Sequence, residues 1–391
     1  MKTKLGTITK SIFDGKHGDC KGQEGSGLFF ISVKDLTEYD IDYSNAREIT
    51  KEDFTTNYLR TNLENGDTLY ANTGDTIGKS VFVKNNPLVK QTSFQKSVAV
   101  IKPNTDFVDS RYLYYLLKYI TPLLKKASSG SAQKNLLLST MRDFDIDIHE
   151  RNEQIRITSV LGAIDDKVRC NLTFCTELES MAKLLYDYWF TQFDFPNEEG
   201  KPYRSSGGVM EWNEQLKREI PKGWDVTTMA SLAPALTGKE DANFSTSNGN
   251  YKFFTCAQET MRCDTPAFSG HAVLIAGNGD FNVKHFTGSF NAYQRTYVLM
   301  PKEAKHYAVM YIAAQKRIQA FKQGANGSIV KFITKGDVEN IPIILPDNDS
   351  LLNTLNQILE KIEHCEREND ELKKLRDWLL PMLMSGQATV E

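Results

Sequence analysis

The second half of this 391-residue chain repeats its first half. The segment 129–136, with a Gly-Ser pair and a lysine three residues later, recurs at a single offset as the segment 326–333. Each copy is followed by an apolar run typical of a strand, at 144–148 and 341–345, and then by one long amphipathic helix. A repeat of half the chain is too long for a solenoid unit. It indicates two similar units that present similar surfaces to a partner of bipartite character.

The composition is that of a globular protein of two or three domains, since 40% of its residues are apolar and 25% are charged. No apolar run approaches the roughly 20 residues that span a membrane, so no membrane partner is expected. No apolar stretch typical of a signal peptide follows the first four residues, which predicts a cytoplasmic protein. The six cysteines form no C-x-x-C pair. This favours reduced thiols over a zinc site.

Charge is distributed unevenly along the chain, although the net charge is only −3. Residues 110–142 include lysines and arginines but no acidic residue, and residues 301–335 include seven basic residues against Glu303 alone. A solvated helix face would explain one such stretch. Two stretches at equivalent places of the repeat favour a shared function, such as contact with a polyanion.

The pattern of short apolar runs, turn residues and helical spacing predicts an α+β fold in five segments. These are a mixed α/β unit over 1–149, a helical spacer over 150–191, a linker rich in Pro, Gly and Ser over 192–221, a second mixed α/β unit over 222–346 and a second helical spacer over 347–391. Strands are expected near 28–33, 68–71, 80–83 and 97–101, and in the second unit near 251–256, 272–276 and 295–299. Helices are expected over 110–124 and 307–323.

The two spacers have the three-four spacing of apolar residues that is typical of a coiled-coil seam. One helix is predicted over 153–190 and the other over 350–380, and each seam includes one polar residue, Asn171 or Asn369. We expect the two helices to pair antiparallel, within an internal pseudo-two-fold repeat. The alternative is that each helix packs only on its own unit.

No catalytic constellation, metal site or cofactor site is predicted. Residues 74–80 resemble a phosphate-binding loop, but Thr73 stands where its first glycine is required, which favours a turn between two strands. The chain has no dinucleotide fingerprint, no nucleophile elbow and no histidine pair of the zinc-protease type. A nucleotide-dependent enzyme built on residues 74–80 therefore stays a weaker hypothesis, which a nucleotide-binding measurement would decide.

Polar residues suited to nucleic acid lie in the repeated loops and in one further loop. Ser131, Gln133, Lys134 and Asn135 offer hydroxyl, amide and ammonium groups, and Asn291, Gln294 and Arg295 offer a similar set in the second half. Asn and Gln can read adenine, and Arg can read guanine, in the major groove. Polar loops are common, so either set alone is weak evidence.

Several motifs, in this order and partly duplicated, resemble the DNA-specificity subunit of type I restriction–modification systems. They are the Gly-Ser-Ala-Gln-Lys-Asn-Leu run at 130–136, Glu-Gln-Ile-Arg-Ile at 153–157, Leu-Gly-Ala-Ile-Asp-Asp-Lys at 161–167, Leu-Glu-Ser-Met-Ala at 178–182, Trp189-Phe190, Ile-Pro-Lys-Gly-Trp at 220–224, Leu-Arg-Asp-Trp-Leu-Leu-Pro at 375–381, and Gly-Asp-Thr-Leu at 66–69 with Thr73-Gly74 and Ile77-Gly78. The resemblance covers essentially the whole chain.

The resemblance implies a non-catalytic subunit with two target-recognition domains held apart by two helical spacers. Its partners would be double-stranded DNA, two DNA methyltransferase subunits and restriction endonuclease subunits. The DNA contacts expected from the matching segments and the polar loops are Thr73, Lys79, Ser131, Gln133, Lys134, Asn135, Asn291, Gln294, Arg295, Ser328 and Lys331. The second Gly-Ser loop lacks the glutamine of the first, and residues 149–152 replace a proline-rich turn.

Two other functions stay open at this point. The chain could be the specificity subunit of a related system whose partner fuses methyltransferase and nuclease, which the neighbouring genes would reveal. It could also be a coiled-coil scaffold, which DNA affinity with a steep salt dependence would exclude.

Overall fold

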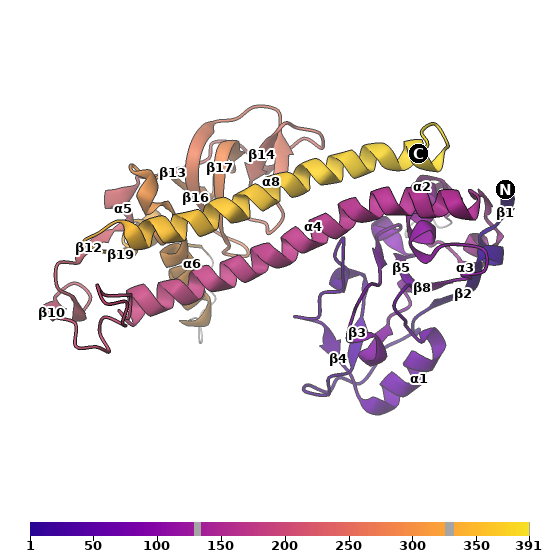
Figure 1. The fold of residues 1–391 in the computed structure, drawn as a ribbon, viewed down its shortest axis with the longest axis horizontal. Coiled ribbons are helices and arrows are strands. Elements are labelled where there is room, and N and C mark those ends of the chain that lie inside the picture. Colours follow the sequence, from indigo (N-terminus) through magenta and orange to yellow (C-terminus); the bar gives the residue numbers. More distant parts are fainter. Residues whose placement is uncertain (129–133, 325–331, 391) are drawn as a thin grey trace. The chain divides into compact units, whose positions relative to one another are not determined.

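The structure is a computed structural model, and it describes residues 1–128, 134–324 and 332–390 (Figure 1). The chain divides into two compact units. Unit 1 comprises Met1–Cys170 together with Glu368–Glu391, and unit 2 comprises Asn171–Arg367. Each unit therefore contains a globular α+β part and a portion of both long helices.

Unit 1 is built on two small sheets. The strand order of the first is β2-β8-β5-β6, with bounds Thr9–Asp14, Val98–Pro103, Thr68–Ala71 and Ser80–Phe82, and that of the second is β4-β3-β7, with bounds Arg47–Glu48, Phe29–Ile31 and Thr92–Phe94. A third pair joins β1 (Lys2–Lys4) to β9 (Asp145–Asp147). The helices are α1 (Lys51–Thr61), α2 (Ser110–Ala127) and α3 (Leu138–Asp143). Asp109 caps α2 by accepting hydrogen bonds from the Arg111 and Tyr112 amides, at 3.0 Å each.

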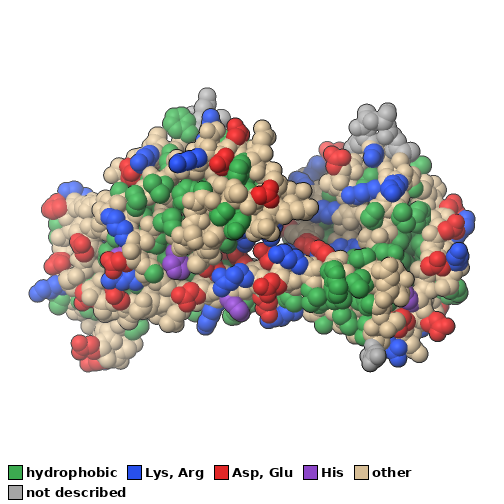
Figure 2. All heavy atoms as spheres, turned by 90° about the horizontal axis from the view of Figure 1, so that it is seen from above, with side chains coloured by type: hydrophobic (Ala, Val, Ile, Leu, Met, Phe, Trp, Pro, Cys, Tyr) green, Lys and Arg blue, Asp and Glu red, His purple; other side chains and the backbone are tan. Residues whose placement is uncertain are grey.

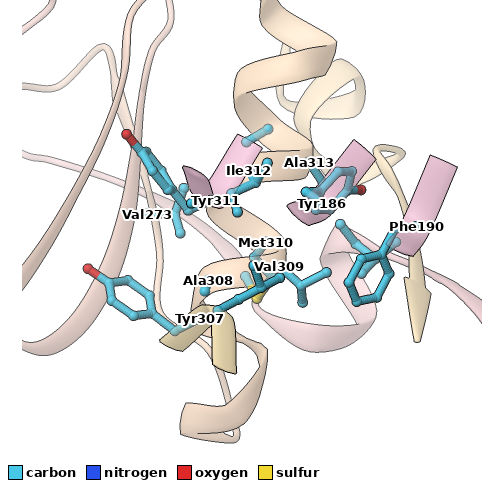
Figure 3. Packing of buried hydrophobic residues seen from close by; sticks show 14 of the residues in the cluster. Tyr186, Phe190, Val273, Tyr307, Ala308, Val309, Met310, Tyr311, Ile312 and Ala313 are labelled. Carbon is cyan, nitrogen blue, oxygen red and sulfur yellow. The ribbon is translucent and has the colours of Figure 1, made fainter. Parts of the chain in front are cut away.

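Unit 2 has one six-stranded sheet. Its order is β13-β18-β16-β17-β14-β15, with bounds Ala235–Thr237, Thr296–Leu299, Phe268–Ala276, Val283–Ala292, Tyr251–Phe254 and Met261–Cys263. Strand β12 (Asp225–Thr228) pairs with β19 (Pro342–Leu345). The helices are α5 (Met229–Leu232), α6 (Tyr307–Gly324) and α7 (Lys335–Glu339). Figure 3 shows the buried side chains of α6 from Tyr307 to Ala313 packed with Tyr186, Phe190 and Val273 in the core of this unit.

The two units share one topology, which confirms the predicted repeat. In each, a central strand (β5 or β16) lies between an antiparallel partner that follows later in the chain (β8 or β18) and a second antiparallel neighbour (β6 or β17). Strand β17 also pairs in parallel with β14 through its last residues, as the separate strand β7 pairs with β3. One long strand in unit 2 thus replaces two short strands in unit 1. Residues 83–91 separate those two strands, so unit 1 has two sheets where unit 2 has one.

The long helices are α4 (Arg151–Tyr186), which continues as a π-helical turn over Asp187–Thr191, and α8 (Ser350–Met384). In unit 1, Asp165 and Lys167 of α4 form ion pairs with Arg376 and Glu368 of α8 at 3.0 Å and 3.1 Å. In unit 2, Cys175 Sγ lies 3.8 Å from the Ile362 carbonyl oxygen. Rising numbers on α4 meet falling numbers on α8, so the predicted antiparallel pairing is confirmed.

Each unit's core also includes both helices. Leu161 and Leu383 belong to the core of unit 1, and Leu178 and Leu355 belong to that of unit 2. The helices therefore pair with each other and pack on the globular parts as well. Asn171 and Asn369 are 3% and 5% exposed, which agrees with polar positions within the seams.

The segment expected to be a linker is folded. Strands β10 (Met210–Asn213) and β11 (Arg218–Pro221) form an antiparallel hairpin. Before the hairpin, Phe195 stacks on Tyr203 and on Trp224, with ring centroids 4.6 Å and 4.7 Å apart. The Pro, Gly and Ser residues therefore serve turns within an aromatic cluster of unit 2, and the segment is more than a flexible connection.

Candidate nucleic-acid interface

In unit 1, the segment that follows β5 meets the segment that precedes α3. The amide of Gly74 donates to the Lys134 carbonyl at 2.8 Å, and the amide of Leu136 donates to the Asn72 carbonyl at 2.9 Å. Leu136 is buried, whereas the side chains of Lys134 and Asn135 are exposed. Thr73 forms a β-bridge with Asn135 and is partly buried. Three of the predicted contact residues therefore lie together at one end of the sheet.

Residues 74–80 form the predicted turn between two strands. Gly74 and Gly78 have positive φ angles of 67° and 94°, and β5 and β6 pair antiparallel on either side. A Cβ atom on Gly78 would lie 2.3 Å from Thr121 Cγ2 of α2, so this turn packs closely on the helix. Lys79 is exposed beside it, and its ammonium group donates to the Val33 carbonyl at 3.4 Å.

Unit 2 has the same arrangement at the end of β16. The amide of Gly277 donates to the Arg295 carbonyl at 2.9 Å, and the amide of Ile333 donates to the Gly277 carbonyl at 2.8 Å. Ile333 is the counterpart of Leu136 at the repeat offset and is likewise buried. Gln294 and Arg295 are exposed at this end of the sheet, which we call the polar edge of the unit, as we do its counterpart at the end of β5. Both units therefore place polar residues where the central strand ends.

Asn291 has a structural role in this arrangement. It is 2% exposed within β17, where its side-chain amide donates to the Thr265 carbonyl at 3.1 Å and its side-chain oxygen accepts from the Ala292 amide at 2.8 Å. Because its amide group is occupied by the chain itself, we remove it from the set of DNA contacts. The predicted contacts Ser131, Gln133, Ser328 and Lys331 lie outside the described residues.

The surface carries charges of both signs. Figure 2 shows basic and acidic side chains interspersed over the face that it presents. At the sheet edge of unit 1, Lys79 and Lys134 accompany Asp75, and at that of unit 2, Arg295 accompanies Asp280. Such an edge suits a few directed contacts better than a broad electrostatic attraction to any polyanion.

Two further observations concern the parts of the chain that the structure describes. Within them, no group of three or more His, Cys, Asp or Glu side chains is arranged to hold a metal ion. No helix among them has the length and apolar character to cross a bilayer.

Comparison with known proteins gives one consistent result. Residues 25–179 and 221–374 match the family described as "Type I restriction modification DNA specificity domain". The EcoDI specificity subunit of Escherichia coli is 34% identical over 180 residues, 44% of this chain and 40% of that protein. The MjaIX specificity subunit of Methanocaldococcus jannaschii is 26% identical over 401 residues, 94% of this chain and 88% of that one. A crystal structure of a type I system S subunit from M. genitalium has a similar fold, with a TM-score of 0.57 at 15% identity over 98% of this chain and 95% of that chain.

Proposed function

The chain belongs to the family of type I restriction–modification DNA specificity subunits, and from this we propose that unit 1 reads one half of a bipartite DNA site and unit 2 reads the other. The observation that carries the proposal is the repeated polar edge, at the end of β5 in unit 1 and of β16 in unit 2. Two edges of the same construction in one chain suit a target with two separately read parts.

Each edge would supply its own contacts. In unit 1 these are Thr73, Lys79, Lys134 and Asn135, together with Ser131 and Gln133. In unit 2 they are Gln294 and Arg295, together with Ser328 and Lys331. Lysines would neutralise phosphates and fix the register, whereas the amide and guanidinium groups would reach base edges. The target-recognition domains would be residues 1–149 and 222–346, with spacers over 150–191 and 347–391.

Exposed apolar side chains on the long helices offer docking positions for partner subunits. Met181 of α4 is 47% exposed and Trp378 of α8 is 60% exposed, and the repeat offset relates the two positions. Leu184, at 70%, extends the first position along α4 by helical spacing. Exposed apolar side chains at neighbouring positions of one helix face would suit a protein interface. Two equivalent positions suit two copies of a methyltransferase subunit, which restriction subunits would join, and those partners would supply the catalysis.

The test measures how the affinity of the full chain for duplex DNA depends on salt. Lys134→Ala should weaken binding and reduce the slope of log affinity against log salt by about one unit, because one phosphate contact is lost. Lys2→Ala, at an exposed position of β1 in another sheet, is the matched control and should leave the slope unchanged. Binding by the wild-type chain without salt dependence would refute the proposal, and an unchanged slope in Lys134→Ala would exclude this lysine from the interface.

A further inference from the structure

We propose that Lys96 and Ser97 in unit 1, and Asn278 in unit 2, are base-reading residues. Lys96 and Ser97 occupy the positions that Gln294 and Arg295 occupy in unit 2. Asn278 occupies the position that Thr73 occupies in unit 1. The proposal rests on the proposed function and adds residues to it. The polar composition of these segments does not reveal the correspondence, because the residue types differ between the units.

Two turns, one in each unit, occupy the same backbone position. Residues 95–97 connect β7 to β8, and residues 293–295 connect β17 to β18. The amide of Asn72 donates to the Ser97 carbonyl at 3.1 Å, as Gly277 donates to Arg295. Within the turns, Val98 donates to the Gln95 carbonyl at 3.0 Å, and Thr296 donates to the Tyr293 carbonyl at 2.8 Å. Ser97 is therefore the counterpart of Arg295.

In each unit, the segment that follows a strand, β2 in unit 1 and β13 in unit 2, holds the turn in the same way. The Lys96 amide donates to the Lys16 carbonyl, and the Gln294 amide donates to the Glu240 carbonyl, at 3.0 Å in each case. Just before these acceptors, a Cβ atom on Gly15 or on Gly238 would lie 1.9 Å from the carbonyl oxygen of Phe94 or Ala292. Each turn is thus fixed by backbone contacts on two sides, which pre-organises any side chain that it carries.

The strand ends correspond as well. The sequence Asn-Thr-Gly-Asp at 72–75 has its counterpart in Gly-Asn-Gly-Asp at 277–280. Gly74 and Gly279 have φ angles of 67° and 70° at equivalent places. Asn278 therefore stands where unit 1 has Thr73, and both residues are partly buried beside their turn.

Three of the four side chains at these turn positions are free to contact a ligand, and the fourth, the Ser97 hydroxyl, donates to Gln95 Oε1 at 3.4 Å within its own turn. In the described parts of the chain, the side chains of Lys96, Gln294 and Arg295 are exposed and take part in no assigned hydrogen bond or ion pair. The backbone positions are shared, but the chemistry differs, with Lys-Ser in unit 1 and Gln-Arg in unit 2. An Arg side chain binds the O6 and N7 atoms of guanine, and Gln binds adenine. We infer that the half-site of unit 2 includes a G·C pair read by Arg295.

The test selects bound sequences from a library of random duplex DNA, using the full-length chain. Arg295→Ala should relax one G·C position in a single half-site by about 10- to 100-fold and leave the other half-site unchanged. The double substitution Lys96→Gln with Ser97→Arg should alter only the other half-site and introduce there the preference that Arg295→Ala removes. Asn278→Ala should relax a position in the half-site affected by Arg295→Ala. Thermal unfolding by circular dichroism establishes that each variant is folded.

The outcomes separate this inference from the proposed function. If the wild-type chain enriches no bipartite motif, the proposed function itself is refuted. If the wild-type motif is bipartite but both the Arg295→Ala variant and the double variant retain it, the turns do not read bases and this inference is refuted. If the double variant changes the same half-site as Arg295→Ala, the correspondence between the turns is wrong.

Discussion

Units 1 and 2 share a backbone topology but attach their globular parts to the long helices with different chemistry. Asp166 of α4 and Glu363 of α8 are related by the repeat offset. In unit 1, Asp166 accepts from Arg111 of α2 at 2.9 Å and from Lys84 at 2.8 Å. In unit 2, Glu363 accepts from Tyr307 of α6 at 2.6 Å and lies 3.1 Å from the His285 ring.

The environments of these carboxylates differ as well. The side chain of Asp166 is 39% exposed, whereas that of Glu363 is 6% exposed. Unit 1 therefore uses a partly solvated ion-pair cluster where unit 2 uses a buried hydrogen-bond network. The shared backbone topology therefore preserves the position of a contact between the long helix and the globular part. The residues that make this contact differ between the two units.

Unit 1 has a second anchor, which the residues at the equivalent positions of unit 2 cannot form. The buried Arg376 of α8 binds Asp165 at 3.0 Å, the Tyr39 hydroxyl at 2.7 Å and Glu38 at 2.8 Å. At the repeat offset, unit 2 has Glu179 for Arg376 and Ile362 for Asp165, so this ion pair cannot form there. The core of unit 1 therefore depends on a charge contributed by the distant end of the chain.

The largest expected effect comes from removing that charge. Arg376→Ala leaves Asp165 buried without its cation and should destabilise unit 1 by about 3–5 kcal/mol. Hydrogen exchange of the α2 amides reports unit 1, and exchange of the α6 amides reports unit 2. We expect faster exchange in α2 with α6 unchanged.

The control for this variant is Lys373→Ala. Lys373 pairs with Glu38 at 3.1 Å but is 33% exposed, so its loss should cost only about 0–1 kcal/mol. Equal acceleration of exchange in α2 and α6 by Arg376→Ala would mean that the two units unfold together. It would contradict the statement that this anchor stabilises unit 1 alone.

A smaller effect should distinguish the units by pH. Burial alone would raise the pKa of Glu363, but hydrogen bonds from His285, Tyr307 and Thr287 outweigh it and hold the pKa below its ordinary value of 4.5. A carboxyl group whose folded pKa is lowered stabilises the fold above its ordinary pKa, and this contribution is lost as the pH falls through the folded value. Glu363→Gln should therefore cost unit 2 about 1–2 kcal/mol at pH 7, with the difference from wild type disappearing in acid below pH 4.5.

Asp166→Asn is the matched change in unit 1. Burial would raise the pKa of Asp166 too, but hydrogen bonds from Arg111 and Lys84 lower it to about 2. Its loss at pH 7 should cost less than that of Glu363, because the carboxylate is partly exposed and screened by solvent. The difference from wild type should persist to lower pH than in Glu363→Gln. The stability of each unit against pH is measured by hydrogen exchange in α2 and α6. Identical pH profiles for the two variants would contradict the distinction between a solvated and a buried anchor.

Much of the fold could be predicted because strong local signals agreed with the tertiary structure. Strand β5 occupies 68–71 as expected, α2 begins at Ser110, and both long helices follow the spacing of their apolar residues. The ten-residue strand β17 was missed. Its sequence includes Lys284, Thr287, Gly288 and Ser289 and shows no apolar alternation, so the strand depends on pairing with β16 along most of its length. Such non-local pairing leaves little local signal.

The candidate site was only partly predictable for a similar reason. The Gly-Ser repeat singled out Lys134, whose counterpart is Lys331, and the same loop included Asn135. The structure shows both side chains exposed beside Thr73, a proximity that the sequence did not predict. Asn291 was selected as a loop residue, but it lies in β17, and its side-chain amide bonds to the backbone of Thr265, between β15 and β16, and of Ala292. Lys96 and Ser97 were not predicted as contacts, because their residue types differ from those of their counterparts Gln294 and Arg295. Only the hydrogen-bond pattern, which is not visible in the sequence, relates these positions.

If each unit reads its own half-site, the exchange of one unit should change one half of the target alone. Residues 222–346 would be replaced by the corresponding residues of a relative with a different target, and the methylated bases of the host genome would be mapped by sequencing. The account predicts a motif in which one half-site is new and the other is unchanged. A motif in which both half-sites change together, or in which neither changes while methylation persists, would contradict independent reading by the two units.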